Sequence, residues 1–325
     1  MRNRWSRLAA PQPLCSNLNA MPIPTFLPAL PEELDAAAYY LANPDVELAR
    51  VDARDHLLRH GLQEGRLQVN RAILAGSDYR RRKFERFETV IAVGGSAFPL
   101  HSGGRVLSLS EYQSESANED FPDFVREADA NPDRLYLDLG CGLRRFNREN
   151  VLYLEVYPSI TADLVVDPTA AYPIRDSTLD GIGCFAVLEH TRRPWVVVEE
   201  IARMLKPGGK AFIDWPFLQP VHGYPSHYYN ATREGLVELF SGNGFEINQA
   251  VTGWHQTPDH TLTWIVGKFM NDLPEPKRRE FAELSVGQLV AHPPGDQFWI
   301  NLLAGLPDHT IAEFACGNSM VATKK

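Results

Sequence analysis

The sequence of 325 residues predicts an α/β fold with a doubly wound, mostly parallel sheet. From residue 134 onward, short apolar runs alternate with amphipathic helical segments, as in parallel strands joined by crossover helices. The first run ends in a glycine-rich turn, and an acidic residue ends each of the next two. Apolar residues make up 44% of the chain and charged residues 22%, which predicts an ordinary packed core.

The first 30 residues are expected to form a flexible tail. Five prolines between residues 11 and 28 interrupt any apolar stretch, so the arginines at the start do not begin a secretion signal. A further hypothesis is that translation starts at Met21, which mass spectrometry of the native N-terminus would test.

Residues 31–75 are expected to form a small helical module. Apolar residues at helical spacing predict a first helix that ends at Asn43. Asp52 is a candidate N-cap of a second helix, with Leu57 and Leu58 facing inward and Gly61 as its stop. Residues 37–66 resemble a short module found beside bacterial glycosyltransferases.

Residues 76–130 are expected to form a connecting or lid segment. Its apolar runs predict short strands at 90–93 and 105–109, followed by a helix over 123–130. The basic run 80–83 is followed by glutamates and is interpreted as a solvated helix face. With a net charge of −9, the chain is not expected to bind nucleic acid.

Residues 131–325 are expected to form the main domain. Helices are predicted at 194–205 and 232–241, and a helical insertion is predicted at about 259–305 before the last strand. No stretch of the sequence is long and apolar enough to predict a membrane-spanning helix. Seven strands are predicted, at 135–139, 151–155, 163–167, 180–187, 210–215, 245–251 and 311–322.

The loop after the first strand is the expected ligand site, because open α/β sheets bind ligands at the carboxyl ends of their strands. Gly140 and Gly142 allow a tight turn there. Glu155 ends the second strand, where a carboxylate can accept hydrogen bonds from ribose hydroxyls, and Asp167 ends the third. Only eight residues separate Gly142 from the second strand, so the first crossover has room for two helical turns at most.

The ordered segments LDLGCG, LEVYP, LVVDP, LDGIGCFAVLEH and MLKPGGKAFIDWPF resemble class I methyltransferases that use S-adenosylmethionine, in particular the type 11 group. The resemblance covers residues 134–250 and implies a Rossmann-like fold with that cofactor. In it, the two glycines would bracket the methionine part, Asp138 would orient the ammonium, Glu155 would hold the ribose and Asp167 would meet the adenine. The implied cofactor-binding residues are Asp138, Gly140, Cys141, Gly142, Glu155, Asp167, Cys184 and Ala186.

The segment 216–230 is unusually rich in histidine and tyrosine for a connector. His222 and His227 are candidate bases for deprotonating a hydroxyl acceptor, because an imidazole titrates near neutral pH. Tyr224, Tyr228 and Tyr229 are candidates for the acceptor pocket. The alternative is a rigid aromatic lid whose histidines bond backbone groups.

No metal site is expected from the sequence. His222 and His227 have no obvious third ligand, and neither does the pair His56 and His60. Glu189 and His190 are expected to fix the turn after the fourth strand.

The sequence therefore predicts a cytoplasmic enzyme that moves a methyl group to a small-molecule or glycan acceptor, with a sugar hydroxyl in surface polysaccharide assembly as the leading candidate. A non-catalytic scaffold with the same fold is the alternative. A nicotinamide oxidoreductase is disfavoured because residue 145 is Arg where a third glycine is needed. The acceptor atom and the oligomeric state are left open.

Overall fold

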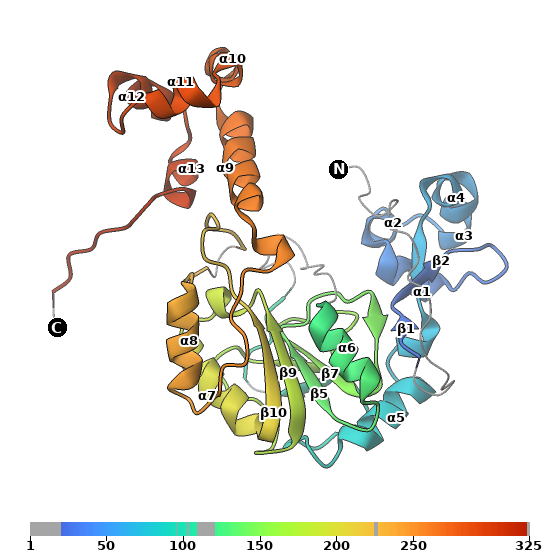
Figure 1. The fold of residues 1–325 in the computed structure, drawn as a ribbon. Coiled ribbons are helices and arrows are strands. Elements are labelled where there is room, and N and C mark those ends of the chain that lie inside the picture. Colours follow the sequence, from blue (N-terminus) through green and yellow to red (C-terminus); the bar gives the residue numbers. More distant parts are fainter. Residues whose placement is uncertain (1–20, 96, 103, 109–120, 224–226, 324–325) are drawn as a thin grey trace.

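The computed structural model describes residues 21–95, 97–102, 104–108, 121–223 and 227–323. A central six-stranded sheet has the order β10-β9-β5-β7-β8-β4, and every pair in it is parallel (Figure 1). This confirms the α/β class, with six strands in the described sheet where seven were predicted. Its strands are β4 (Leu100–Ser102), β5 (Tyr136–Leu139), β7 (Val151–Glu155), β8 (Leu164–Val166), β9 (Leu179–Phe185) and β10 (Leu205–Asp214).

Helices cover both faces of this sheet, as near-continuous apolar strands require. On one face α7 (Pro194–Met204) and α8 (Arg233–Ser241) pack on a core that includes Leu137 and Leu152. On the other face α6 (Pro122–Ala130) packs on Tyr136 and its neighbours. The helices predicted at 123–130, 194–205 and 232–241 are therefore confirmed.

The sheet is wound in two directions from β5. The chain passes from β5 to β7 and β8 on one side, then returns to β9 and β10 on the other. The strand order thus reverses between β5 and β9, and the carboxyl ends of these two strands flank the place where such folds bind ligands.

The first crossover contains no helix, which is consistent with the limit of two helical turns that its length sets. Residues 140–150 instead hold the short β6 (Phe146–Asn147), which pairs antiparallel with β1 (Ile23–Pro24). Buried Thr25 donates its hydroxyl to the carbonyl of Arg144 at 2.5 Å, and its backbone amide donates to the carbonyl of Arg145 at 2.8 Å. The N-terminal segment therefore supports the loop where a crossover helix is missing.

This support corrects the expectation of a flexible tail up to residue 30. In addition to β1, β2 (Phe26–Pro28) pairs with β3 (Leu67–Val69). Residues 1–20 lie outside the described part of the chain. Strand pairing was not predictable there because the prolines favour loop structure and the partners are far along the sequence.

The N-terminal module is helical, as predicted, but its second helical run ends four residues later than expected. Its elements are α1 (Ala36–Ala42), α2 (Pro44–Leu48), α3 (Ala53–His56), a π-helical turn (Leu57–Gly61) and α4 (Leu62–Glu64). The Asp52 carboxylate caps α3 as predicted. The stop is Gly65, whose φ of 65° is left-handed, and not Gly61. Leu57 is buried as expected, whereas Leu58 is exposed.

The segment 76–130 joins the main sheet through β4. The predicted strand at 90–93 is wrong, since Ile91 makes only an isolated bridge to Ile174. Residues 105–108 are not a strand either, and residue 109 lies outside the described residues. The actual strand contains a histidine and a serine, and it pairs as an edge strand, so it lacks the apolar pattern that signals a strand.

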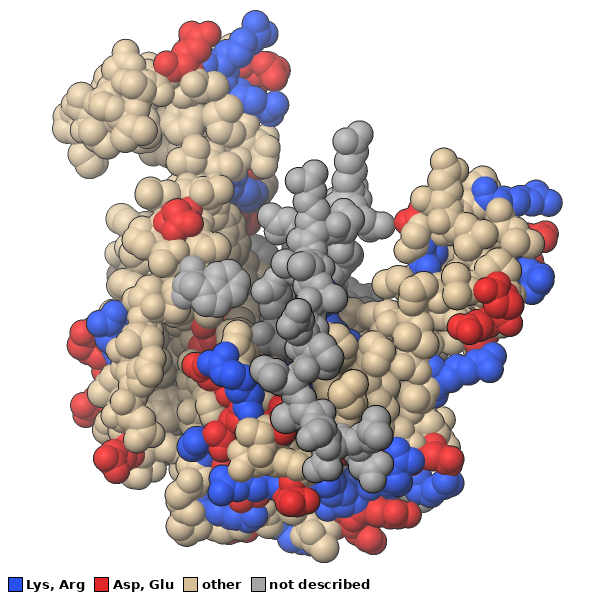
Figure 2. All heavy atoms as spheres, turned by 45° about the vertical axis from the view of Figure 1, so that its right-hand side comes forward, with Lys and Arg blue, Asp and Glu red and all other residues tan. Residues whose placement is uncertain are grey.

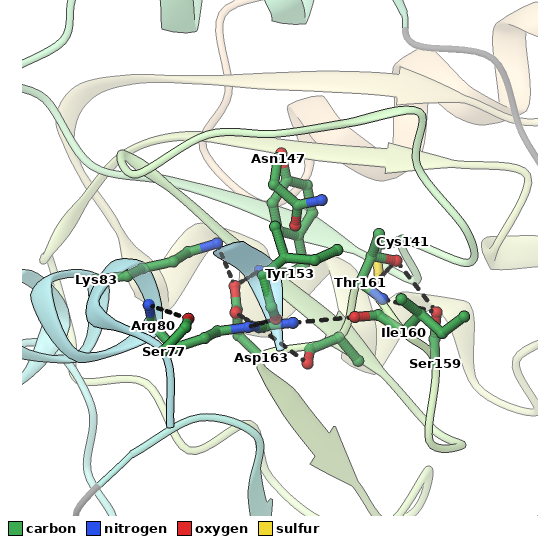
Figure 3. A network of polar contacts seen from close by, with 12 residues as sticks. Ser77, Arg80, Lys83, Cys141, Asn147, Tyr153, Ser159, Ile160, Thr161 and Asp163 are labelled. Carbon is green, nitrogen blue, oxygen red and sulfur yellow. Dashed lines mark hydrogen bonds and ion pairs between the residues drawn. The ribbon is translucent and has the colours of Figure 1, made fainter. Parts of the chain in front are cut away.

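The basic run is the main error in the sequence interpretation of this segment. Arg80 and Lys83, on α5 (Asp78–Phe87), are buried and both form ion pairs with buried Asp163 (Figure 3). Spacing of three residues places these two cations on one helix face, which packs against the sheet. Arg81 and Arg82 are exposed as predicted.

The C-terminal part is an arm of helices, with no closing strand among its described residues (Figure 1). The strand predicted at 245–251 is wrong because Phe245 and Ile247 pack on the core from a segment without regular structure. The strand predicted at 311–322 is also wrong, because its start is helical. The helices are α9 (Pro258–Asp272), α10 (Glu275–Glu283), α11 (Val286–Ala291), α12 (Gln297–Leu303) and α13 (Asp308–Glu313).

These helices share a small apolar cluster of their own around Leu273, Phe281 and Leu302. None of the described helices combines the length and the apolar character that crossing a membrane requires.

In Figure 2, lysines and arginines are mixed with acidic side chains over the lower face of the molecule, so charge of one sign does not dominate that face.

Candidate functional site

The glycine turn after β5 lies against the loop after β9. Gly140 and Gly142 have φ of 70° and 55°, which a residue with a side chain adopts at a cost. A Cβ on Gly140 would lie 2.3 Å from Cγ2 of Val187. Ala186, next to Val187, also has a positive φ of 54°. Both loops of the switch point therefore hold strained or glycine-dependent backbone, which is common where ligands bind.

Asp138 is buried and already paired. Arg144 donates from Nε to its Oδ2 at 2.6 Å and from Nη2 to its Oδ1 at 2.9 Å. Both side chains are 3% exposed. They line a small pocket together with Phe121, Phe124 and Phe185. The sequence interpretation missed Arg144, although the short crossover requires the chain to turn back within a few residues of Asp138.

Glu155 and Asp167 occupy the ends of neighbouring strands, as predicted. Glu155 Oε1 accepts from the backbone amide of Gly142 at 3.0 Å, so it joins β7 to the glycine turn. Asp167 follows β8 and accepts from the amide and hydroxyl of Thr169 and from the amide of Arg105. These hydrogen bonds, with that from the Thr169 hydroxyl first, lower the pKa of Asp167.

Two cysteines line the same region as neutral thiols. Cys141 and Cys184 are fully buried, and burial raises the pKa of each thiol well above its ordinary value. They therefore contribute apolar surface and no nucleophile. Ala186, beside Cys184 on the strand end, donates its amide to the carbonyl of Asp214 at 3.1 Å.

The carbonyl of Gly142 is held by two hydroxyl groups from the turn between β7 and β8. Ser159 and Thr161 donate to it at 2.9 and 2.5 Å. Their hydroxyl oxygens also lie 3.1 Å from each other (Figure 3). The same turn continues to Asp163, where the buried ion pairs to α5 begin. The glycine turn is thus fixed through a continuous polar network.

The two candidate bases come together with the turn after β9. The ring centroids of His222 and His227 are 4.5 Å apart, and each lies within 5.5 Å of the ring of His190. Burial lowers the pKa of His222, so its imidazole is neutral at physiological pH.

The hydrogen bonds of these two imidazoles differ. Nδ1 of His222 donates a hydrogen bond to the carbonyl of Pro220 at 2.8 Å, so Nε2 carries the lone pair of the neutral ring. Nε2 of His227 lies 2.8 Å from Oδ1 of Asn230, so it donates there, and Nδ1 then accepts from the amide of His222 at 3.2 Å. Both nitrogens of His227 are therefore engaged.

Of the candidate acceptor residues, Tyr228 and Tyr229 are partly exposed on the same connector. The Tyr228 ring faces the guanidinium of Arg192, and the Tyr229 ring contacts Trp195 at the start of α7. Tyr224 lies outside the described residues.

Glu189 is the most unusual group near the cluster. It lies in a short 3-10 helix, Leu188–His190, and is fully buried. Neither of its carboxylate oxygens has a hydrogen-bond partner among the described residues. Burial, with a smaller contribution from the charge of Asp214, raises the pKa of Glu189 to about 8. Its backbone carbonyl accepts from the amide of Tyr228 at 2.6 Å, which joins the two loops.

One further pair lies at the end of β10. Asp214 Oδ2 lies 2.6 Å from Nε2 of His255 and accepts from Gln256 at 2.8 Å. The sequence interpretation missed this pair, because 41 positions separate its members and no motif surrounds His255.

Comparison with known proteins supports a methyltransferase domain at this site. Residues 137–213, which run from β5 into β10, match the family model described as a methyltransferase domain. No curated protein sequence matches the chain.

Two solved structures are similar to part of the chain. YcgJ protein from Bacillus subtilis has 14% identity and a TM-score of 0.31, over 49% of this chain and 86% of that one. Phosphoethanolamine N-methyltransferase 2 from Haemonchus contortus, in complex with phosphomonomethylethanolamine and S-adenosylhomocysteine, has 15% identity and a TM-score of 0.30, over 53% of this chain and 46% of that one. The fold itself rests on the sheet order described above.

Proposed function

We propose that this protein transfers a methyl group from S-adenosylmethionine to a hydroxyl of a small-molecule or glycan acceptor. The observation that carries the proposal is the row of acidic residues Asp138, Glu155 and Asp167 on neighbouring strands β5, β7 and β8, beside the glycine turn. This row lies within the match to a methyltransferase domain. The leading acceptor is a sugar hydroxyl, as the resemblance of the N-terminal module to glycosyltransferase-associated segments implies.

The donor set fits the cofactor. When bound, S-adenosylmethionine supplies an electrophilic methyl group on its sulfonium. Glu155 accepts from the amides of Gly142 and Val156, and ribose hydroxyls can add to these bonds because each carboxylate oxygen accepts more than one hydrogen bond. Asp167, beside it, is partly exposed, and its hydrogen bonds lower its pKa and favour the charged form. Asp138 and Arg144 are a matched pair for a zwitterion: the carboxylate suits an ammonium and the guanidinium suits a carboxylate.

The acceptor side is proposed to be the histidine cluster. Methyl transfer to a hydroxyl requires loss of the hydroxyl proton, and a neutral imidazole with a free lone pair can take it. His222 meets that requirement at Nε2. His227 orients His222 by accepting a hydrogen bond from the backbone amide of His222. Tyr228 and Tyr229 would shape the rim of this region.

Alanine variants at His222 and His227 test these roles. We expect His222→Ala to lower the rate of methyl transfer by roughly 10²–10⁴-fold, the usual contribution of a general base, with cofactor binding unchanged. We expect a smaller loss in His227→Ala, because it changes only the orientation of His222. Full activity in both variants would remove the histidine cluster from the mechanism.

The Asp138–Arg144 pair also favours a second candidate, a non-catalytic scaffold with this fold. Both side chains are almost fully buried and already bond each other, so a ligand that uses them has to compete with this pair. Calorimetry with S-adenosylhomocysteine separates the two candidates, because only the enzyme has to bind it.

A further inference from the structure

The buried carboxylate of Glu189 has no hydrogen-bond partner among the described residues, and this needs a physical explanation. It is fully buried, and neither oxygen receives a hydrogen bond. A buried polar group without a partner is destabilising, and a carboxylate more so than most. A catalytic role or a bound ion is a common explanation for such a group in a folded protein.

Two imidazoles face this carboxylate. One ligand atom each from Glu189, His190 and His222 can be chosen so that all three lie within 4.8 Å of one another. Nε2 of His190 is 3.8 Å from Oε1 of Glu189. Gly223 makes this approach possible: a Cβ there would lie 2.5 Å from Cε1 of His190, and its φ is 60°.

The tautomer of His222 suits a ligand role. Because Nδ1 donates to the carbonyl of Pro220, Nε2 keeps its lone pair on the other side of the ring. Metal-bound histidines typically donate their second nitrogen in this way, which fixes the ring and raises its basicity. His227 is a positioning residue here, because its own nitrogens are engaged by Asn230 and by the His222 backbone.

We propose that Glu189, His190 and His222 form a binding site for a divalent transition metal of the Zn²⁺ class. Two imidazoles and one carboxylate are a common protein ligand set for zinc sites that keep one position open. Bond lengths of about 2.0–2.1 Å place tetrahedral ligands roughly 3.3 Å apart, so the present spacing has to contract by less than the length of one bond. The sequence did not predict this site, because Glu189 and His190 lie about thirty positions before His222.

This proposal deepens the proposed function. The metal site does not depend on that function, whereas the effect of the metal on catalysis rests on it. Zinc and an acceptor's proton compete for the same lone pair on His222. Bound zinc is therefore expected to slow any methyl transfer that uses His222 as the base. Metal binding itself requires neither the methyl donor nor the acceptor.

The test is metal binding by the full chain, prepared without a histidine tag and stripped with a chelator. Titration calorimetry with ZnCl₂ and the visible absorption of bound Co²⁺ are measured on the wild type and on Glu189→Gln, His190→Ala and His222→Ala. His60→Ala is the control, because it disrupts the distant His56–His60 pair. Circular dichroism establishes that each variant is folded.

We expect one Zn²⁺ per chain, a tetrahedral Co²⁺ spectrum, and at least tenfold weaker binding in each of the three site variants that folds, with the control unchanged. Absence of binding to the wild type overturns the proposal, as does unchanged affinity in His190→Ala and His222→Ala. If the wild type binds zinc but not S-adenosylhomocysteine, the proposed function fails and the metal site stands.

Discussion

The buried cluster of Arg80, Lys83 and Asp163 gives the sharpest prediction from this structure. One carboxylate serves two cations, so the fully buried group carries a net positive charge at pH 7 (Figure 3). Asp163 Oδ2 is 2.5 Å from Nζ of Lys83 and also accepts from the amide of Tyr153 at 3.0 Å. Substituting Asp163 and substituting Lys83 should therefore have very different effects.

Asp163→Asn leaves two buried cations without a counter-ion. Removing one partner of a buried ion pair costs about 3–5 kcal/mol of the free energy of unfolding. For a domain of this size, 1 kcal/mol shifts the melting temperature by about 2–4 °C, so the loss should be roughly 6–20 °C. Lys83→Met keeps the Arg80–Asp163 pair and removes the excess charge, so its free energy of unfolding should stay within about 1 kcal/mol of the wild type.

The pH dependence provides a second test of the same cluster. Burial lowers the pKa of Lys83 from 10.5 to about 8. Between these values the unfolded chain holds a proton that the folded chain has lost, so stability rises with pH in this window. At about 1.4 kcal/mol per pH unit, the wild type should gain about 3 kcal/mol relative to Lys83→Met between pH 8 and 10.5.

Circular dichroism with urea denaturation measures both effects on the same samples. The difference between wild type and Lys83→Met cancels other groups that titrate in this window, such as surface lysines. A loss in Lys83→Met as large as that in Asp163→Asn would refute this reasoning, and so would a stability difference that does not change with pH.

Two other predictions concern the loop after β5. Gly140→Ala should lower the free energy of unfolding by about 2 kcal/mol and weaken cofactor binding, because the added Cβ would clash with Val187 and the φ of residue 140 is positive. Thermal unfolding and calorimetry measure the two losses, and a variant with unchanged stability and binding would contradict the close approach to Val187. Thr25→Val should cost about 1–3 kcal/mol, because it removes the buried hydrogen bond from the Thr25 hydroxyl to the carbonyl of Arg144 and the one that this hydroxyl accepts from Asn147. The exposed Thr89→Val should cost almost nothing, and equal losses would contradict support of the loop by the N-terminal segment.

The sequence predicted the central sheet well because its signal is local. Strands β5, β7 and β8 are apolar runs ended by glycine or acidic residues, and burial on both faces produces the apolar pattern. The edge strand β4 and the two segments wrongly predicted as strands near the C-terminus are not buried on both faces of the sheet. Apolar residues at 245–251 pack on the core without regular structure, and the segment 311–322 begins in a helix. Apolar periodicity alone does not distinguish such segments from strands.

The candidate site was predictable where its residues follow strands, and not where distant segments meet. Glu155 lies against the glycine turn as its position implied. The pairing of Asp138 with Arg144, the burial of Lys83 and the approach of Glu189 to His222 depend on tertiary packing. The basic run was misjudged for the same reason, since the carboxylate of Asp163 lies 83 positions after Arg80.

Calorimetric titration of the full chain with S-adenosylhomocysteine tests the central claim most directly, with Glu155→Gln as the matched variant. The structure predicts one molecule bound per chain in the wild type and at least tenfold weaker binding in the variant, because Glu155 joins the glycine turn to the expected ribose position. No heat of binding in the wild type, or equal affinity in the variant, would contradict a cofactor site at the ends of β5 and β7.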